Sequence, residues 1–232
     1  MARQSAPGLL RLLAVVLALG LLWLAQQAGR AGIAGIYGDS VARYQQQMRD
    51  KPALVADYAS EGAGKIAIAR RYAPGHADYA LQAATLAAAV GNYDEAIPLL
   101  QHALARSPVR ADLWSRLATY AYAAQGTTDM TVHALDSALY FGPREYDAHL
   151  ANATIILGSG NQLDVARRVR GWNDLVAAAA MPQLSQSITD MARAAGLERQ
   201  LQTQVREKAS ARAALEQRDQ DKQRQGQRGA RP

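Results

Sequence analysis

The pattern of apolar and polar residues after residue 65 predicts a series of short helices separated by turn residues. Gly91-Asn92, Gln125 to Thr128, and Gly158 to Gly160 are typical turn sequences. After Pro182, an apolar stripe indicates a helix that closes the series; its residues are Leu184, Ile188, Met191 and Ala195. The other predicted helices cover residues 65–72, 77–90, 94–106, 111–124, 129–140, 146–157 and 163–172.

The helices recur in pairs, because Pro74, Pro108 and Pro143 are spaced by about 34 residues. A proline after each second helix stops that helix, since its nitrogen carries no hydrogen to donate. Other residue types recur in the same register, and together they predict an all-α fold of stacked helical hairpins. These residues are Ala69, Ala103 and Ala138; Asp78, Asp112 and Asp147; and Thr85, Thr119 and Thr154.

The N-terminal segment, residues 1–30, is predicted to be a signal-anchor. Residues 12–25 are apolar without interruption, and residues 9–25 reach the lower limit of the ~17–25 residues that span a bilayer. A buried core helix fits poorly, because the segment has no polar face. A cleavable signal peptide is the alternative, but Gly29-Arg30-Ala31 is a poor cleavage site. The arginines before the segment favour a cytoplasmic N-terminus and a periplasmic remainder.

The regions on either side of the repeats carry weaker signals. Residues 31–64 are assigned to a linker and the first helices, and the glycine-rich residues 29–38 fit either a linker or a helix extension. Residues 65–205 form the predicted helical-repeat domain. The polar, basic residues 206–232 have little to bury, so we expect a disordered tail or a frayed helix.

Composition excludes several classes of function. The chain of 232 residues has no cysteine, so disulfides, thiolate catalysis and cysteine-bound metals are absent. Its net charge of +6 resides mainly in the two ends, and residues 31–205 are nearly neutral. We therefore expect no nucleic-acid partner. The four histidines lack metal-ligand spacing, and no nucleophile elbow or phosphate loop is present, so we expect no metal, no cofactor and no enzyme activity.

Residues 91–108 (GNYDEAIPLLQHALARSP) closely resemble the second half of a tetratricopeptide (TPR) repeat, and Trp114, Leu117 and Ala118 match the next first helix. The match is strong over residues 77–143 and weaker over 65–76 and 144–175. Together with the membrane segment, residues 139–157 resemble small membrane-anchored repeat proteins of bacterial exopolysaccharide systems. That resemblance implies an inner-membrane scaffold for polysaccharide biosynthesis or export.

The TPR resemblance also implies which residues face a concave groove that binds a protein partner. Positions 2, 5, 9 and 12 of each first helix face this side in the family. An acidic edge, a hydroxylated centre and one aromatic ring would suit an extended or helical segment. Aspartate near a helix start also stabilises the helix dipole, so part of this pattern has a structural explanation. The predicted partner-binding residues are Asp78, Thr85, Asp112, Ser115, Thr119, Tyr122, Asp147 and Thr154.

Two other hypotheses belong to different classes. An enzyme of cell-wall or polysaccharide chemistry would need a pocket of paired carboxylates or histidines between the helices. A self-associating structural subunit would use the groove to bind another copy of the chain. Arg167, Arg168 and Arg170, beside Trp172, form a basic cluster that fits a solvated face or, as a lesser alternative, an anion or sugar-phosphate contact.

Overall fold

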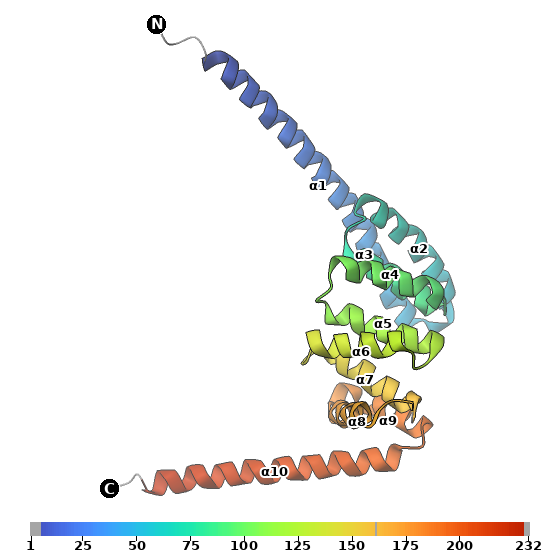
Figure 1. Cartoon of the computed structure of the whole chain (residues 1–232), viewed down its shortest axis with the longest axis vertical. Coiled ribbons are helices and arrows are strands. Elements are labelled where there is room, and N and C mark those ends of the chain that lie inside the picture. The colour runs from blue at the N-terminus through green and yellow to red at the C-terminus, as the bar shows by residue number, and fades with distance from the viewer. Residues whose placement is uncertain (1–5, 161, 230–232) are drawn as a thin grey trace. The chain divides into compact units, whose positions relative to one another are not determined.

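The computed structural model describes residues 6–160 and 162–229, and in these residues the regular secondary structure is entirely helical (Figure 1). The all-α class is therefore confirmed. The chain divides into two compact units, the first ending at Val109 and the second beginning at Arg110. We describe each unit by itself.

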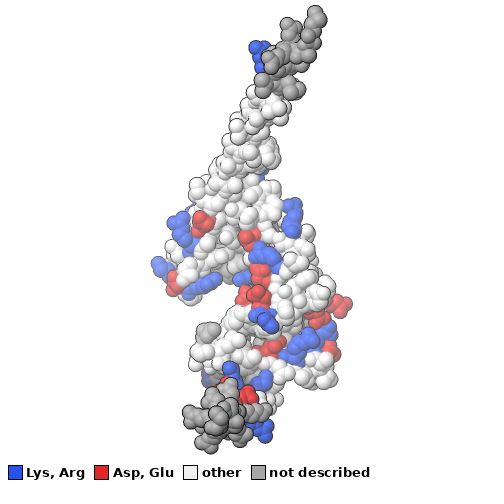
Figure 2. All heavy atoms as spheres, turned by 90° about the vertical axis from the view of Figure 1, so that its left-hand side faces the viewer, with Lys and Arg blue, Asp and Glu red and all other residues white. Residues whose placement is uncertain are grey.

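The first helix, α1 (Ala6–Asp50), joins the apolar segment to the first unit without a break. Residues 29–38 lie inside this helix, so they form a helix extension and not a linker. Leu12 to Leu24 are exposed, and Figure 2 shows this part of the helix as a surface without charged groups. Among the described residues, α1 alone is long and apolar enough to cross a membrane.

The C-terminal half of α1 packs into the first unit. Ala34 and Val41 are fully buried there, and α1 contacts both α2 (Val55–Tyr72) and α3 (Ala77–Ala89). A short 3₁₀ turn, η1 (Pro52–Leu54), links α1 to α2. The helix α4 (Tyr93–Arg106) pairs with α3. The first unit therefore contains the α1–α2 pair before the strongly repeated residues, which begin at Ala77.

The second unit continues the pairing of helices. Helix α5 (Ala111–Gln125) pairs with α6 (Asp129–Phe141), and α7 (Tyr146–Ser159) pairs with α8 (Val165–Ala179) and also packs on α5. Helix α9 (Pro182–Ala194) and the start of α10 (Glu198–Gly229) close the unit against α8. Leu175, Ile188 and Leu201 belong to the apolar cluster that holds these last helices together.

The helix boundaries predicted between residues 77 and 157 are confirmed to within two residues. The helix predicted over residues 65–72 begins earlier, at Val55, and the helix predicted over residues 163–172 continues to Ala179. The helices α2, α4 and α6 each end just before Pro74, Pro108 and Pro143 respectively. Gly91 and Gly126 have φ of 77° and 73°, a backbone conformation that glycine adopts without strain, and they end α3 and α5 at the expected turns. The stacking of these hairpins into a TPR superhelix is a finer prediction that these boundaries do not test.

The C-terminal region differs from the expected disordered tail. Helix α10 runs from Glu198 to Gly229, so the structure gives the helical alternative and does not confirm disorder. Leu201 is buried against the second unit, whereas the helix is exposed from Arg206 to at least Gln220. Its polar sequence offers few apolar side chains to pack, so only its first turns are held by burial.

We expect Gly171→Ala to destabilise the second unit. Gly171 is buried in α8, and an added Cβ would lie 2.6 Å from Ile156 Cδ1 and 2.9 Å from Ile156 Cβ on α7. Because Ile156 Cβ is fixed to the backbone, the contact cannot relax by rotation of the side chain. Overpacking costs about 1–3 kcal/mol and outweighs the ~0.5–1 kcal/mol by which alanine favours a helix.

Urea denaturation followed by circular dichroism measures this effect. Gly64→Ala in α2 is the matched control, because an added Cβ at that site meets no atom within 4 Å. We expect this control to unfold at the same or a higher urea concentration than the parent chain. Equal unfolding midpoints for the two variants would contradict the close contact between α7 and α8.

Candidate partner-binding groove

Four of the predicted partner-binding residues line one cavity in the second unit. The cavity lies between α5 and α7 and has a volume of about 290 Å³. We call it the α5–α7 groove. It brings together residues that are more than thirty positions apart in the sequence, because α7 packs on α5. Its lining residues are Ser115, Arg116, Thr119, Tyr120, Asp147, Leu150, Ala151 and Thr154.

The hydroxyl groups of the groove are already used as donors. Ser115 Oγ donates to Ala111 O at 2.8 Å, and Thr119 Oγ1 donates to Ser115 O at 2.9 Å. Thr154 Oγ1 donates to Leu150 O at 2.9 Å. Each hydroxyl thus bonds the backbone one turn earlier in its own helix. Toward a ligand these oxygens offer lone pairs, so they suit backbone N–H groups of a bound segment better than carbonyls.

A donor for such carbonyls comes from a residue that our sequence analysis missed. Arg116 lines the groove, and its Nε is buried without a hydrogen-bond partner among the described residues. Burial of an unpaired polar group is costly, so a bound acceptor at this position would be stabilised. Gln82 Oε1 in α3 is likewise buried and unpaired among the described atoms. Gln82 and Arg116 occupy the same register, one position after Leu81 and Ser115, which could have drawn attention to them.

The three aspartates of the repeated register have different surroundings. Asp112 accepts hydrogen bonds from Arg110 Nε at 3.0 Å and from Arg110 NH2 at 2.6 Å. Asp147 is exposed and lines the groove. Asp78 lies in the first unit, where its carboxylate is 3.7 Å from His76 Nδ1. Of the three, Asp147 is the carboxylate best placed to meet a partner in the second unit.

Thr85 and Tyr122 also lie outside the α5–α7 groove. Thr85 belongs to the first unit, donates to Leu81 O at 2.9 Å, and lines a separate cavity beside α1. Tyr122 is half-buried, and its hydroxyl lies so close to Gly158 of α7 that a Cβ there would clash with it. Tyr122 therefore packs α5 against α7, where it fills space that the glycine leaves open.

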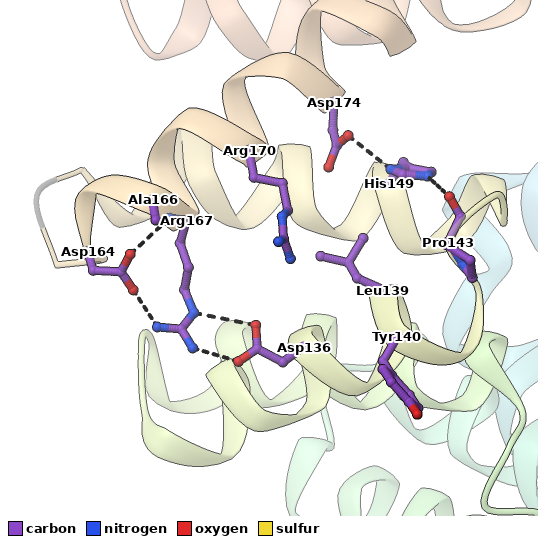
Figure 3. A pocket seen from close by; sticks show the side chains of 10 residues that line it. All are labelled: Asp136, Leu139, Tyr140, Pro143, His149, Asp164, Ala166, Arg167, Arg170 and Asp174. Carbon is purple, nitrogen blue, oxygen red and sulfur yellow. Dashed lines mark hydrogen bonds and ion pairs between the residues drawn. The ribbon is translucent and has the colours of Figure 1, made fainter.

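A larger cavity of the second unit lies between α6 and α8 (Figure 3). We call it the α6–α8 cavity, and its volume is about 890 Å³. Arg167 spans it by bonding Asp136 on α6 and Asp164 at the start of α8. These two carboxylates raise the pKa of the Arg167 guanidinium, chiefly through their hydrogen bonds. The lining residues are Asp136, Leu139, Tyr140, Pro143, His149, Asp164, Ala166, Arg167, Arg170 and Asp174.

The predicted basic cluster is divided by these contacts. Arg167 is held by two aspartates, Arg170 lines the cavity, and Trp172 packs against the apolar cluster of α8, α9 and α10. Sequence analysis gave no role to Asp136, His149 or Asp174, which come together with Arg170 only through the packing of α6, α7 and α8. Among the described residues, no group of three or more His, Asp or Glu side chains is placed to hold a metal ion.

We expect Arg110→Gln to raise the pKa of Asp112. Partial burial alone raises the pKa of this carboxyl, but the hydrogen bonds and charge of Arg110 outweigh burial and lower it. The ionised Asp112 therefore stabilises the fold above the unfolded pKa of about 3.9, and this contribution is lost as the pH falls through the lower folded pKa. Carbon-13 NMR of labelled aspartate measures the pKa directly. Arg144→Gln, at an exposed site outside this pair, is the control, and a similar shift in both variants would contradict the assignment.

Comparison with known proteins does not assign the chain to a family. No model of a known protein family matches the chain, and no curated protein matches it. The site must therefore be interpreted from its own residues. The α5–α7 groove combines fixed acceptor oxygens, one exposed carboxylate and one unpaired donor, which is an arrangement suited to binding polar backbone groups.

Proposed function

We propose that the protein is a membrane-anchored scaffold that binds an extended segment of another protein in the α5–α7 groove. Arg116, whose buried Nε has no partner among the described residues, lines the same groove as the acceptor oxygens of Ser115, Thr119 and Thr154, and this combination carries the proposal. A peptide backbone supplies N–H donors and carbonyl acceptors in alternation, so it can satisfy both kinds of group at once. Asp147 at the same groove favours a partner with a basic side chain.

The structure of α1 supports the membrane anchor. Exposure of many large apolar side chains to water is unfavourable, at about 25 cal/mol for each Å² of apolar surface. Trp23, near the end of the apolar segment, is 59% exposed, as an aromatic residue at a membrane interface would be. Insertion of residues 9–25 into a bilayer removes this surface from water. Ala34 and Val41, further along the same helix, are fully buried in the first unit, which attaches that unit to the anchor.

The proposal includes a place in the cell. The bias of basic residues before the apolar segment favours a cytoplasmic N-terminus and periplasmic helical units in a bacterial envelope. The close agreement of the helix boundaries with the repeated prolines supports hairpins of the TPR type. The resemblance to exopolysaccharide-associated repeat proteins suggests that the scaffold assembles part of that machinery.

Site-specific photo-crosslinking on the full chain in membranes tests the groove. A benzophenone side chain at Thr119, in the groove, should crosslink a partner protein. The same side chain at Asp129 should not, because Asp129 is exposed on α6 and does not line the groove. Adding Arg116→Gln should reduce the Thr119 crosslink several-fold, since one net hydrogen bond contributes about 1 kcal/mol.

Three results would contradict this assignment or part of it. Equal crosslinking from Thr119 and Asp129 would place the partner outside the α5–α7 groove. A single crosslinked product with twice the mass of the chain would show self-association and favour the structural subunit. If Arg116→Gln left the Thr119 crosslink unchanged, Arg116 Nε would not contribute to partner binding.

Cysteine labelling tests the orientation, and the absence of native cysteines makes single substitutions specific. In cells with a permeabilised outer membrane, Gln125→Cys should react with a membrane-impermeant maleimide, because Gln125 is exposed at the end of α5. Gln4→Cys, which precedes the apolar segment in sequence, should react only after lysis. The reverse labelling pattern would place the helical units in the cytoplasm.

A further inference from the structure

The α6–α8 cavity holds several charged groups in fixed positions (Figure 3). Asp136 accepts from Arg167 NH2 at 2.6 Å, while Asp164 caps α8 by accepting from Arg167 N at 2.9 Å. Each carboxylate keeps lone pairs beyond these bonds, because an ionised carboxylate can accept about four. The two aspartates therefore offer hydrogen-bond acceptors whose geometry is set before any ligand binds.

A third carboxylate is fixed on another wall of the cavity. Asp174 Oδ1 lies 3.0 Å from His149 Nδ1, and Asp174 Oδ2 accepts from the buried Asn152. His149 Nε2 in turn lies 3.0 Å from the carbonyl of Pro143. These contacts hold Asp174 at the cavity surface through residues of α7 and the turn before it. Such a network restricts the side chains and lowers the entropy cost of binding.

Arg170 and Tyr140 differ from the groups around them. Arg170 extends into the cavity, and Figure 3 draws no hydrogen bond or ion pair from its guanidinium to the other nine lining residues. Tyr140 lines the cavity, is 79% exposed, and forms a T-shaped ring pair with Phe141 at a centroid distance of 5.1 Å. A guanidinium can bind a carboxylate through two parallel hydrogen bonds, and an exposed aromatic ring offers a flat apolar surface.

We propose that the α6–α8 cavity binds an acidic saccharide, a chain of sugar rings that carries a carboxylate. Arg170 binds the carboxylate, Asp136 and Asp174 accept from ring hydroxyls, and the Tyr140 ring packs against the face of one sugar. The volume of about 890 Å³ lies within the range of ligand sites, roughly 300–1,000 Å³. This site is separate from the α5–α7 groove and does not depend on the proposed scaffold function.

The polar groups of the cavity favour this ligand over two others. The three aspartates repel any anion and the two arginines attract it, so the charge alone does not select the ligand. A bare inorganic anion has few hydrogens to donate to the aspartates, whereas a saccharide can bind Arg170 through its carboxylate and the aspartates through its hydroxyls. An apolar peptide side chain would desolvate the Asp, His and Arg side chains, which make up six of the ten lining residues. A saccharide has many hydroxyl groups that both donate and accept, so it can pair with the aspartates and the arginine at the same time.

Calorimetric titration of the full chain in detergent tests the proposal. The probes are trigalacturonic acid, neutral maltotriose, triglutamate peptide and inorganic phosphate. We expect trigalacturonic acid to bind more tightly than the other three. Arg170→Gln should weaken its binding about tenfold, as loss of a charge-assisted pair predicts, and leave maltotriose unchanged. Tyr140→Ala should weaken both saccharides.

Two control variants outside the cavity accompany this test, and three results would contradict the proposal. Arg199→Gln on α10 and Tyr72→Ala on α2 lie outside the cavity and should bind like the parent chain. Arg170 and Tyr140 are exposed, so their replacement should leave the circular dichroism spectrum unchanged. Tighter binding of triglutamate or phosphate would overturn the saccharide assignment, as would the same affinity for trigalacturonic acid in Arg170→Gln or no binding of that probe.

Discussion

The close approach of helices through small residues is the constraint on which the rest of the structure depends. Ala69, Ala103 and Ala138, which recur in one register of the repeat, are all fully buried. Alanine loses no side-chain entropy in a helix and lets two backbones pack closely. Gly171 allows an even closer approach of two helices, because Ile156 occupies the space that a Cβ would need. This packing fixes the rotation of each helix and thereby decides which side chains reach the α5–α7 groove and the α6–α8 cavity.

Helix α1 must satisfy two environments with one continuous backbone. Its first half exposes apolar side chains, and its second half buries Ala34 and Val41 against the first unit. A helix rises about 1.5 Å per residue, so Ala34 lies only ~14 Å along the axis from the end of the apolar segment at Ala25. No flexible linker separates the two halves. If α1 spans a bilayer, the first unit is held close to the membrane surface and its orientation follows that of the helix.

The sequence predicted the local features of the fold well, because prolines and glycines act locally. Pro108 stops a helix through its own missing N–H, and Gly126 permits a positive φ at a turn, whatever packs nearby. Residues 29–38 were ambiguous because glycine weakens a helix without forbidding it. In the structure they are helical, and only the later ones, such as Ala34, are buried. The site was harder to predict. The contact between Arg167 and Asp136 joins residues 31 positions apart. The lack of a hydrogen-bond partner for Arg116 Nε depends on where all the neighbouring side chains lie, which the sequence does not reveal.

The repeat also shows which side chains stay the same and which differ from one hairpin to the next. Positions that pack, such as Ala103 and Ala138, are alanine in each hairpin, whereas a neighbouring, partly or fully buried position holds a different residue in each hairpin. Gln82, Arg116 and Ala151 occupy one such position, and only the first two place a polar atom there. The threonines keep the same hydrogen bond to their own helix in all three hairpins, so they give a constant surface of acceptors. If the two proposed sites bind ligands, discrimination between ligands must come from the variable residues, above all Arg116 in the α5–α7 groove and Arg170 in the α6–α8 cavity.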